Sequence, residues 1–274
     1  MFLKKNTNSE SLKYSIKIKN FYNKSQDFVI SPFNPFGVIS DFGKEVLDKY
    51  INEFNNKKIL DIGCGHGHLL KYLSDRGAKT HGVDISDVAL KVARHNSPKS
   101  KLITGEGGKL PFNDNFFDYI ICIETAEHFL NIQKAFNEMY RVIKKGGILI
   151  LSNPNYFNTA GILKLLLEKF KFYPKNTFAP FSNWKKQSNE NFVTILNLKQ
   201  KLIRSGFVVF DQFTYNLLHG LIPFISVNWT FYRFWPIRKL RHIVERARNI
   251  FPLNKIGMNV ITVCQKPKKL ISQR

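Results

Sequence analysis

The sequence predicts an α/β domain built on a parallel sheet, and two observations lead to that prediction. From residue 57 to residue 153, short apolar runs alternate with segments of helical periodicity, an order typical of parallel strands joined by crossover helices on both faces of a sheet. The first run leads directly into a glycine-rich turn, ILDIGCGHGHLL, that opens a helix. A chain of 274 residues is long enough to bury a large core, so we expect residues 1–274 to form a single domain.

The expected elements can be placed in order along the chain. Residues 1–35 are expected to form a lid or cap segment, and residues 36–54 have the pattern of a helix. The alternating strands and helices then follow as KKILDI, HLLKYLSDRG, KTHGVDI, DVALKVARHN, KLIT, FDYIICI, NIQKAFNEMYRVI and GGILILSN. Asp87 is placed to cap the second of these helices. Beyond residue 153 we expect helices in AGILKLLLEKF and TILNLKQKLIRSG, and strands in FVVFDQFTY and NVITVCQ.

Three glycines, Gly63, Gly65 and Gly67, lie where the first strand turns into a helix. Without a Cβ atom, glycine lets the backbone bend sharply and lets a ligand approach the main-chain amides, as in nucleotide-binding turns. The second strand ends at Asp84, whose carboxylate can accept hydrogen bonds from both hydroxyls of a ribose. The spacing GxGxG departs from the GxGxxG of dinucleotide sites. Asp61, just before it, suits a ligand with ammonium and sulfonium cations better than a pyrophosphate.

These residues are part of a longer resemblance. The stretches ILDIGCGHGHLL, GVDIS, GEGGKLPFNDNFFDYIICIETAEHF and LNIQKAFNEMYRVIKKGGILILSNPN follow one another over residues 57–153. Together they resemble class I S-adenosylmethionine-dependent methyltransferases, specifically the type-11 group that includes quinone-biosynthesis O-methyltransferases. The resemblance implies a Rossmann-like sheet of seven strands, the last one antiparallel, with helices on both faces. It also implies S-adenosyl-L-methionine as the cofactor and methyl transfer as the activity.

The resemblance further implies roles for individual residues. Asp61 and the turn would line the methionine half of the cofactor, Asp84 would bind the ribose, and Ile85 would pack on the adenine. Glu106 stands where the family usually has an aspartate that reaches the adenine amino group. The full implied set, in which the last two residues border the cofactor opposite the turn, is Asp61, Gly63, Cys64, Gly65, Gly67, Asp84, Ile85, Glu106, Gly107, Ile123 and Glu124.

An oxygen nucleophile usually needs its proton removed when it accepts a methyl group. His128, just after the fourth strand, is the best-placed base, because the carboxyl ends of parallel strands face the ligand in such sheets. The alternative is a structural histidine at a helix start. Glu127 beside it either orients the imidazole or favours the helix N-terminus. The spacing of His66 and His68 does not indicate a metal site, since no acid or cysteine pair lies nearby.

The tetrapeptide NPNY at residues 153–156 is similar to the NPPY motif of nucleic-acid methyltransferases that methylate amino groups of bases. In those enzymes the motif follows the fourth strand, whereas here it follows the fifth expected strand. The fourth strand ends in ICIETAEH, which has no amide directed at an exocyclic amine. Methylation of bases is therefore disfavoured.

The positive charge is concentrated in the last third of the chain. The net charge is +22, and residues 154–274 alone carry 20 basic and 4 acidic side chains. Such a field attracts nucleic acid or anionic lipid, although biased genome composition also produces lysine-rich sequences. Residues 229–251 combine a cluster of aromatics with an apolar helical stripe flanked by arginines. This pattern favours an interfacial helix on an anionic membrane; packing on the protein's own core is the alternative, and nucleic acid is disfavoured because no RNA-binding signature accompanies it.

The expected division of the domain follows from these features. The segments are an N-terminal cap segment and helix (1–56), a cofactor-binding half (57–153), the second half of the sheet (154–215), an aromatic and basic insertion (216–257) and a final strand (258–267). The chain shows no signal-peptide pattern and no apolar run near the ~20 residues of a membrane-spanning helix. Three widely spaced cysteines do not indicate a disulfide framework. We therefore expect a cytoplasmic protein, peripheral at the inner face of the membrane.

Together these observations predict an S-adenosylmethionine-dependent methyltransferase acting on a small-molecule acceptor. The expected reaction is O-methylation of a lipid-like or lipid-linked glycan substrate. Two alternatives remain open at this point, namely an RNA methyltransferase and a cofactor-binding module without turnover.

Overall fold

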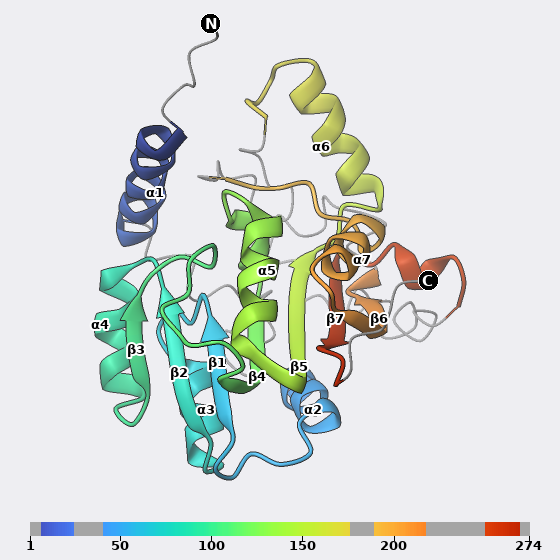
Figure 1. Cartoon of the computed structure of the whole chain (residues 1–274). Helices are drawn as coiled ribbons and strands as arrows, with labels where there is room; N and C mark the ends of the chain where they lie inside the picture. The colour runs from blue at the N-terminus through green and yellow to red at the C-terminus, as the bar shows by residue number, and fades with distance from the viewer. Residues whose placement is uncertain (1–6, 25–40, 176–188, 218–249, 269–274) are drawn as a thin grey trace, which may run out of the picture.

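The computed structural model describes residues 7–24, 41–175, 189–217 and 250–268, and its centre is a seven-stranded sheet (Figure 1). The strand order is β3-β2-β1-β4-β5-β7-β6. The strands are β1 (Lys58–Ile62), β2 (Lys79–Asp84), β3 (Lys101–Thr104), β4 (Phe117–Ile123), β5 (Ile143–Pro154), β6 (Val208–Tyr215) and β7 (Asn259–Gln265). Strands β1 to β5 pair in parallel, whereas β7 runs antiparallel between β5 and β6. The expected sheet, with its antiparallel last strand, is confirmed.

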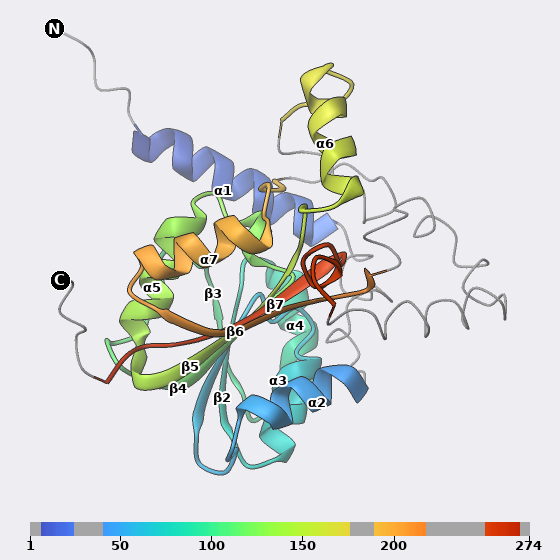
Figure 2. The same cartoon turned by 90° about the vertical axis from the view of Figure 1, so that its right-hand side faces the viewer.

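Helices cover both faces of this sheet (Figure 2). The described helices are α1 (Thr7–Lys24), α2 (Asp41–Tyr50), α3 (His68–Asp75), α4 (Asp87–Asn96), α5 (Ile132–Val142), α6 (Thr159–Lys169) and α7 (Ile195–Arg204), with short 3₁₀ turns η2 (Ala126–His128) and η5 (Leu253–Lys255). Within these ranges no helix is both long and apolar enough to cross a membrane.

Neighbouring residues of strand β1 pack into two different hydrophobic cores, one on each face of the sheet. Leu60 of β1 is buried with Phe136 of α5 and Leu198 of α7 on one face. Its neighbour Ile59 is buried with Leu73 of α3, and with residues of α2, on the other face. A parallel strand buried on both faces needs apolar residues at consecutive positions, which explains the continuous apolar runs of the sequence.

The chain reverses its direction of winding between β1 and β4. From β1 it passes through α3 to β2, while β4, on the other side of β1, leads through α5 to β5. The helices of the two crossovers pack on opposite faces. Ligands of open α/β sheets bind at the carboxyl ends of the strands at such a reversal. This is the edge at which Asp61, Asp84 and Ile123 lie.

The structure corrects two details expected from the sequence. Helix α2 ends at Tyr50 rather than at residue 54. Ser86, not Asp87, caps α4, because its Oγ accepts a hydrogen bond from the Ala89 amide at 3.1 Å. Asp87 instead forms an ion pair with Lys19 of α1 at 2.5 Å, and it does so because α1 lies against α4.

Helix α1 was not expected, and it falls in the N-terminal cap segment. The rest of that segment, residues 25–40, lies outside the described residues, as do residues 218–249. The predicted aromatic cluster and most of the predicted basic helix of the insertion therefore stay predictions.

Candidate functional site

The glycine turn after β1 has the backbone conformation that glycine favours. The φ angles of Gly63, Gly65 and Gly67 are +77°, +49° and +77°. A Cβ atom on Gly63 would lie 2.2 Å from Oγ1 of Thr125, which follows β4. The turn thus touches the loop after β4 so closely that a side chain at Gly63 would separate the two.

Asp84 is fixed at the end of β2 by main-chain amides. Its Oδ2 accepts from the amide of Gly65 and its Oδ1 from the amide of Ser86, both at 2.8 Å. Burial raises the pKa of this carboxyl, and the two amides oppose that rise by stabilising the anion. Each carboxylate oxygen has capacity for a second hydrogen bond, so a diol could still bind to Asp84.

Asp61 is a buried carboxylate to which none of the described residues donates a hydrogen bond. It is 3% exposed, and no hydrogen bond from the described part of the chain reaches it. Burial, and then the charge of Asp84, raise its pKa to about 8. An unpaired buried charge is costly, and a cation beside it removes that cost. The ammonium and sulfonium groups of S-adenosylmethionine therefore fit this end of the turn.

Two further residues of the implied set, Cys64 and Glu106, differ in the surroundings of their side chains. The side chain of Cys64 points into the core, where a Cβ on Gly82 would lie 2.8 Å from its Sγ. Only the main chain of Cys64 can therefore face a ligand. The carboxylate of Glu106 accepts a hydrogen bond from Ser15 of α1 at 2.9 Å, so α1 reaches the residue implied for the adenine.

Three more residues of the implied set, Ile85, Gly107 and Ile123, lie in the turns after β2 and β3 and at the end of β4. Ile85 is half-buried beside Asp84, and Gly107 lies against the ring of Phe129, which a Cβ would meet at 2.6 Å. Ile123 is buried in the core at the end of β4.

Glu124 extends toward β5 and β7. Its carboxylate accepts from Ser152 of β5, and from the Asn259 side chain of β7 at 3.1 Å. Burial raises its pKa to about 7. Because β5 lies on the side of β4 away from β1, this side chain is turned from the glycine turn toward the other end of the site.

His128 lies in the turn η2 after β4, and its tautomer is fixed by the main chain. Its Nδ1 lies 2.8 Å from the carbonyl oxygen of Asn189. A carbonyl only accepts, so Nδ1 carries the hydrogen and Nε2 of the neutral ring is left as the basic nitrogen. The Glu127 carboxylate lies 3.6 Å from Nε2, longer than a hydrogen bond. The ring of Tyr22 from α1 contacts the imidazole edge to face, with the two ring centroids 5.8 Å apart.

Glu127 is 1% exposed, and its Oε2 accepts a hydrogen bond from Asn153 at 2.7 Å. Burial raises its pKa well above the usual range, and the charges of Glu124 and Glu190 raise it further. Glu190, just before α7, is equally buried and accepts from Tyr156 at 2.5 Å. The structure thus places two buried carboxyl groups, those of Glu127 and Glu190, beside His128.

The sequence did not reveal Glu190, because it lies in a polar loop with no periodicity. The one available signal was the run SNEN at residues 188–191. The motif at residues 153–156 donates hydrogen bonds to both of these carboxyls: the Asn153 side chain donates to Glu127, and the Tyr156 hydroxyl donates to Glu190. In the described ranges no group of three or more His, Cys, Asp or Glu side chains is arranged to hold a metal ion.

Comparison with known proteins agrees with this geometry. Residues 60–151 match the family model described as a methyltransferase domain. The chain is 28% identical to the ubiquinone biosynthesis O-methyltransferase of Rickettsia canadensis over 165 residues, which are 58% of this chain and 69% of that protein. It is 30% identical to the phthiotriol/phenolphthiotriol dimycocerosates methyltransferase 1 of Mycobacterium ulcerans over 105 residues, 37% of this chain and 39% of that protein.

Solved structures show the same fold. The S-adenosylmethionine-dependent methyltransferase of Mesorhizobium loti superimposes with a TM-score of 0.56 at 16% identity, over 83% of this chain and 99% of that chain. A methyltransferase of Thermotoga maritima gives a TM-score of 0.53 at 20% identity, over 81% and 86%. The fold, the glycine turn with its two aspartates and the family match agree, and the chain is a class I S-adenosylmethionine-dependent methyltransferase that belongs to the type-11 group.

Proposed function

We propose that this methyltransferase transfers a methyl group to a hydroxyl of a lipid-like or lipid-linked acceptor at an anionic membrane surface. The observation that supports hydroxyl chemistry is His128. Its Nδ1 hydrogen is held by the Asn189 carbonyl, and its basic Nε2 is left to accept a proton. A base of this kind is needed for an alcohol or phenol.

The cofactor would be held by the residues of the glycine turn. Asp61 would pair with its cations, Asp84 would accept from its ribose, and Glu106 would accept from its adenine amino group once Ser15 is displaced or shared. S-adenosylmethionine, when bound, supplies an already activated methyl group. The work of the protein is then to align the acceptor oxygen with that group and to exclude other nucleophiles.

Two named relatives support the acceptor class. One is a ubiquinone biosynthesis O-methyltransferase and the other a phthiotriol/phenolphthiotriol dimycocerosates methyltransferase. We extend to this chain only what the two names share, which is methylation of an acceptor with large apolar parts.

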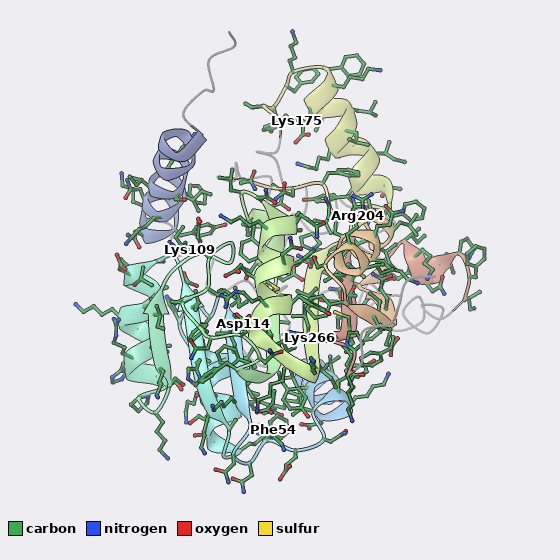
Figure 3. All side chains as sticks on the ribbon, viewed as in Figure 1. Phe54, Lys109, Asp114, Lys175, Arg204 and Lys266 are labelled. Atoms are coloured by element: carbon green, nitrogen blue, oxygen red, sulfur yellow. The ribbon has the colours of Figure 1, made fainter. Side chains whose placement is uncertain are left out.

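The surface of α6 supports the membrane part of the proposal. α6 follows β5 at the end of the sheet that holds the site, and stands away from the sheet (Figure 1). Its helix and flanks expose six large apolar side chains, Phe157, Ile162, Leu165, Leu166, Phe170 and Phe172. Lys169, Lys171 and Lys175 are exposed next to them, and Lys175 is labelled beside α6 in Figure 3. Apolar residues bordered by lysines suit the interface of an anionic bilayer. The basic segment 229–251 would add to the same attraction.

The test of this proposal compares a hydroxyl acceptor with an amine acceptor in vesicles. A prenylated phenol and its aniline analogue are embedded in phosphatidylglycerol vesicles and incubated with methyl-labelled S-adenosylmethionine. We expect the label in the phenol as a methyl ether. Label in the aniline alone would contradict hydroxyl chemistry.

Flotation of the protein with these vesicles tests the membrane surface. Ile162→Glu should weaken binding to phosphatidylglycerol, while Leu196→Glu, at a similarly exposed apolar residue of α7, should not. Equal loss in both variants, or binding that does not fall with salt, would argue against α6 as the docking surface.

A further inference from the structure

His128 is held from one side by the three-residue segment 189–191. Its Nδ1 donates to the Asn189 carbonyl at 2.8 Å, and one carboxylate oxygen of Glu190 lies 3.3 Å from the same nitrogen. The Asn191 side chain donates to the main-chain oxygens on either side of His128, at 2.8 and 2.7 Å. This clamp fixes the position of Glu190 relative to the imidazole.

Glu190 is better supported as an anion than Glu127. The hydroxyl of Tyr156 donates to its Oε1 at 2.5 Å. Burial raises the pKa of Glu190 and the charge of Glu168 adds to that rise, whereas His128, Tyr156 and the fully buried Lys164 favour its charged form. Charge on Glu190 therefore has a donor and two cationic or potentially cationic neighbours.

Glu127 has no comparable support. Its charged form is favoured by its own main-chain amide and by the neutral side-chain amide of Asn153, while the charges of Glu124 and Glu190 both oppose its ionisation. Carboxyls that repel one another in a buried site are not readily ionised together, and of Glu127 and Glu190 the less supported one keeps its proton. Of these two carboxyls, Glu127 thus keeps its proton more readily and Glu190 ionises first.

We propose that Glu190 is the positioning residue that makes His128 a general base, with the Asn189 carbonyl fixing the tautomer. The inference rests on the proposed function. As the acceptor oxygen bonds to the methyl carbon, the electron pair of the breaking carbon–sulfur bond stays on sulfur. The hydroxyl proton passes to Nε2 of His128. The ring then carries a positive charge, which the Glu190 carboxylate, 3.3 Å from Nδ1, stabilises by its own charge, while the Nδ1 hydrogen stays bonded to the Asn189 carbonyl.

The first test reads the imidazole directly and needs no acceptor. The full chain, labelled with ¹⁵N-histidine and bound to S-adenosylhomocysteine, is studied by NMR at pH 6, with the His128 signals assigned by their loss in His128→Gln. We expect the hydrogen on Nδ1 in the wild type. In Glu190→Gln the tautomer should persist, because the Asn189 carbonyl still holds it, but the protonated fraction should fall. The groups facing the ring are Glu127, Tyr22, Asn189 and Glu190, so the same spectrum of Glu127→Gln is the comparison.

The second test measures turnover with the prenylated phenol in phosphatidylglycerol vesicles. Glu190→Gln should lower kcat by about 10- to 100-fold, part of the ~10²–10⁴-fold that general-base catalysis supplies, with KM for S-adenosylmethionine unchanged. Tyr156→Phe keeps the carboxylate and removes one donor, so it should shift both readouts less and in the same direction. It replaces Glu190→Gln if that variant does not fold.

The two proposals can fail separately. An unchanged protonated fraction and kcat in Glu190→Gln, or a loss seen in Glu127→Gln instead, would overturn the role of Glu190. If the wild type does not methylate the phenol while Glu190→Gln still loses protonated imidazole, the acceptor class is wrong and the role of Glu190 stands.

Discussion

The main-chain amide of Gly65 donates a hydrogen bond to the side-chain carboxylate of Asp84 at 2.8 Å. This bond joins the turn after β1 to the end of β2, so the residue implied for the ribose and the turn implied for the methionine half are held together before a ligand arrives. A site that is already ordered loses less entropy on binding.

Asp84→Asn should therefore abolish tight cofactor binding. The new amide group would face a main-chain amide with a donor where an acceptor is needed, and one ribose contact would also be lost. Two such losses correspond to about 100-fold in affinity, measured by calorimetry with S-adenosylhomocysteine. Asp118→Asn, near the amino end of β4, is the control and should bind normally. Binding by Asp84→Asn within a factor of about three of the wild type would refute the site.

Gly63→Ala tests the contact between the two loops. The added methyl would lie 2.2 Å from Oγ1 of Thr125 at a φ of +77°, so the loops must separate, and we expect loss of cofactor binding together with a lower Tm. Gly108→Ala is the matched control, because the nearest atom to its Cβ would be 3.7 Å away. Similar behaviour of the two variants would show that the turn is not closely packed.

Cofactor affinity should rise with pH through the titration of Asp61. Its pKa in the free protein is about 8, so at pH 6 the carboxyl is neutral and must lose its proton to pair with a cation. Affinity should increase up to about tenfold per pH unit between pH 6 and 8 and then level off. Asp61→Asn should bind weakly and lose this slope. A slope retained in Asp61→Asn would assign the proton to another group.

The same substitution should stabilise the protein without ligand at high pH. The folded pKa of Asp61 lies above its ordinary value of 3.8, so the carboxyl favours folding at low pH and that contribution is lost as the pH rises through about 8. Asp61→Asn should raise Tm at pH 9 more than at pH 5 in thermal unfolding scans. An equal change at both pH values would mean that charge burial is not the cause.

The buried ion pair of α6 should matter for stability. Lys164 is fully buried and donates to Glu168 at 2.7 Å. Lys164→Met leaves that carboxylate without this partner, at a cost of about 3–5 kcal/mol in the free energy of unfolding. The double variant Lys164→Met with Glu168→Leu should recover much of the loss in urea denaturation. If the double variant is no more stable than the single one, the pair is not what stabilises α6.

The sheet could be predicted because β1, β4 and β5 are buried on both faces, and such strands have continuous apolar runs in their sequence. Helix α1 could not. Its segment LKYSIKIK alternates apolar and polar residues with the period of a strand, yet it folds as a helix. Contacts with α4 and with Glu106, distant in the chain, hold it there.

The candidate site also contains residues that the sequence indicated and one that it did not. Asp61, Asp84 and His128 could be identified because each lies next to the carboxyl end of a strand. Glu190 follows Asn189, which is 61 residues beyond its partner His128. The segment 189–191 reaches the site through hydrogen bonds of Asn189 and Asn191 to residues 127–129, for which no local pattern exists.

The most direct test of the account follows the transferred methyl group. Methyl-labelled S-adenosylmethionine is incubated with the protein and a lipid extract of the source cell, and in parallel with total RNA of that cell, with Asp84→Asn and His128→Gln as controls. We predict label in the lipid fraction as a methyl ether, none with Asp84→Asn and much less with His128→Gln. Tight cofactor binding with no labelled lipid, or label found in RNA instead, would contradict the account.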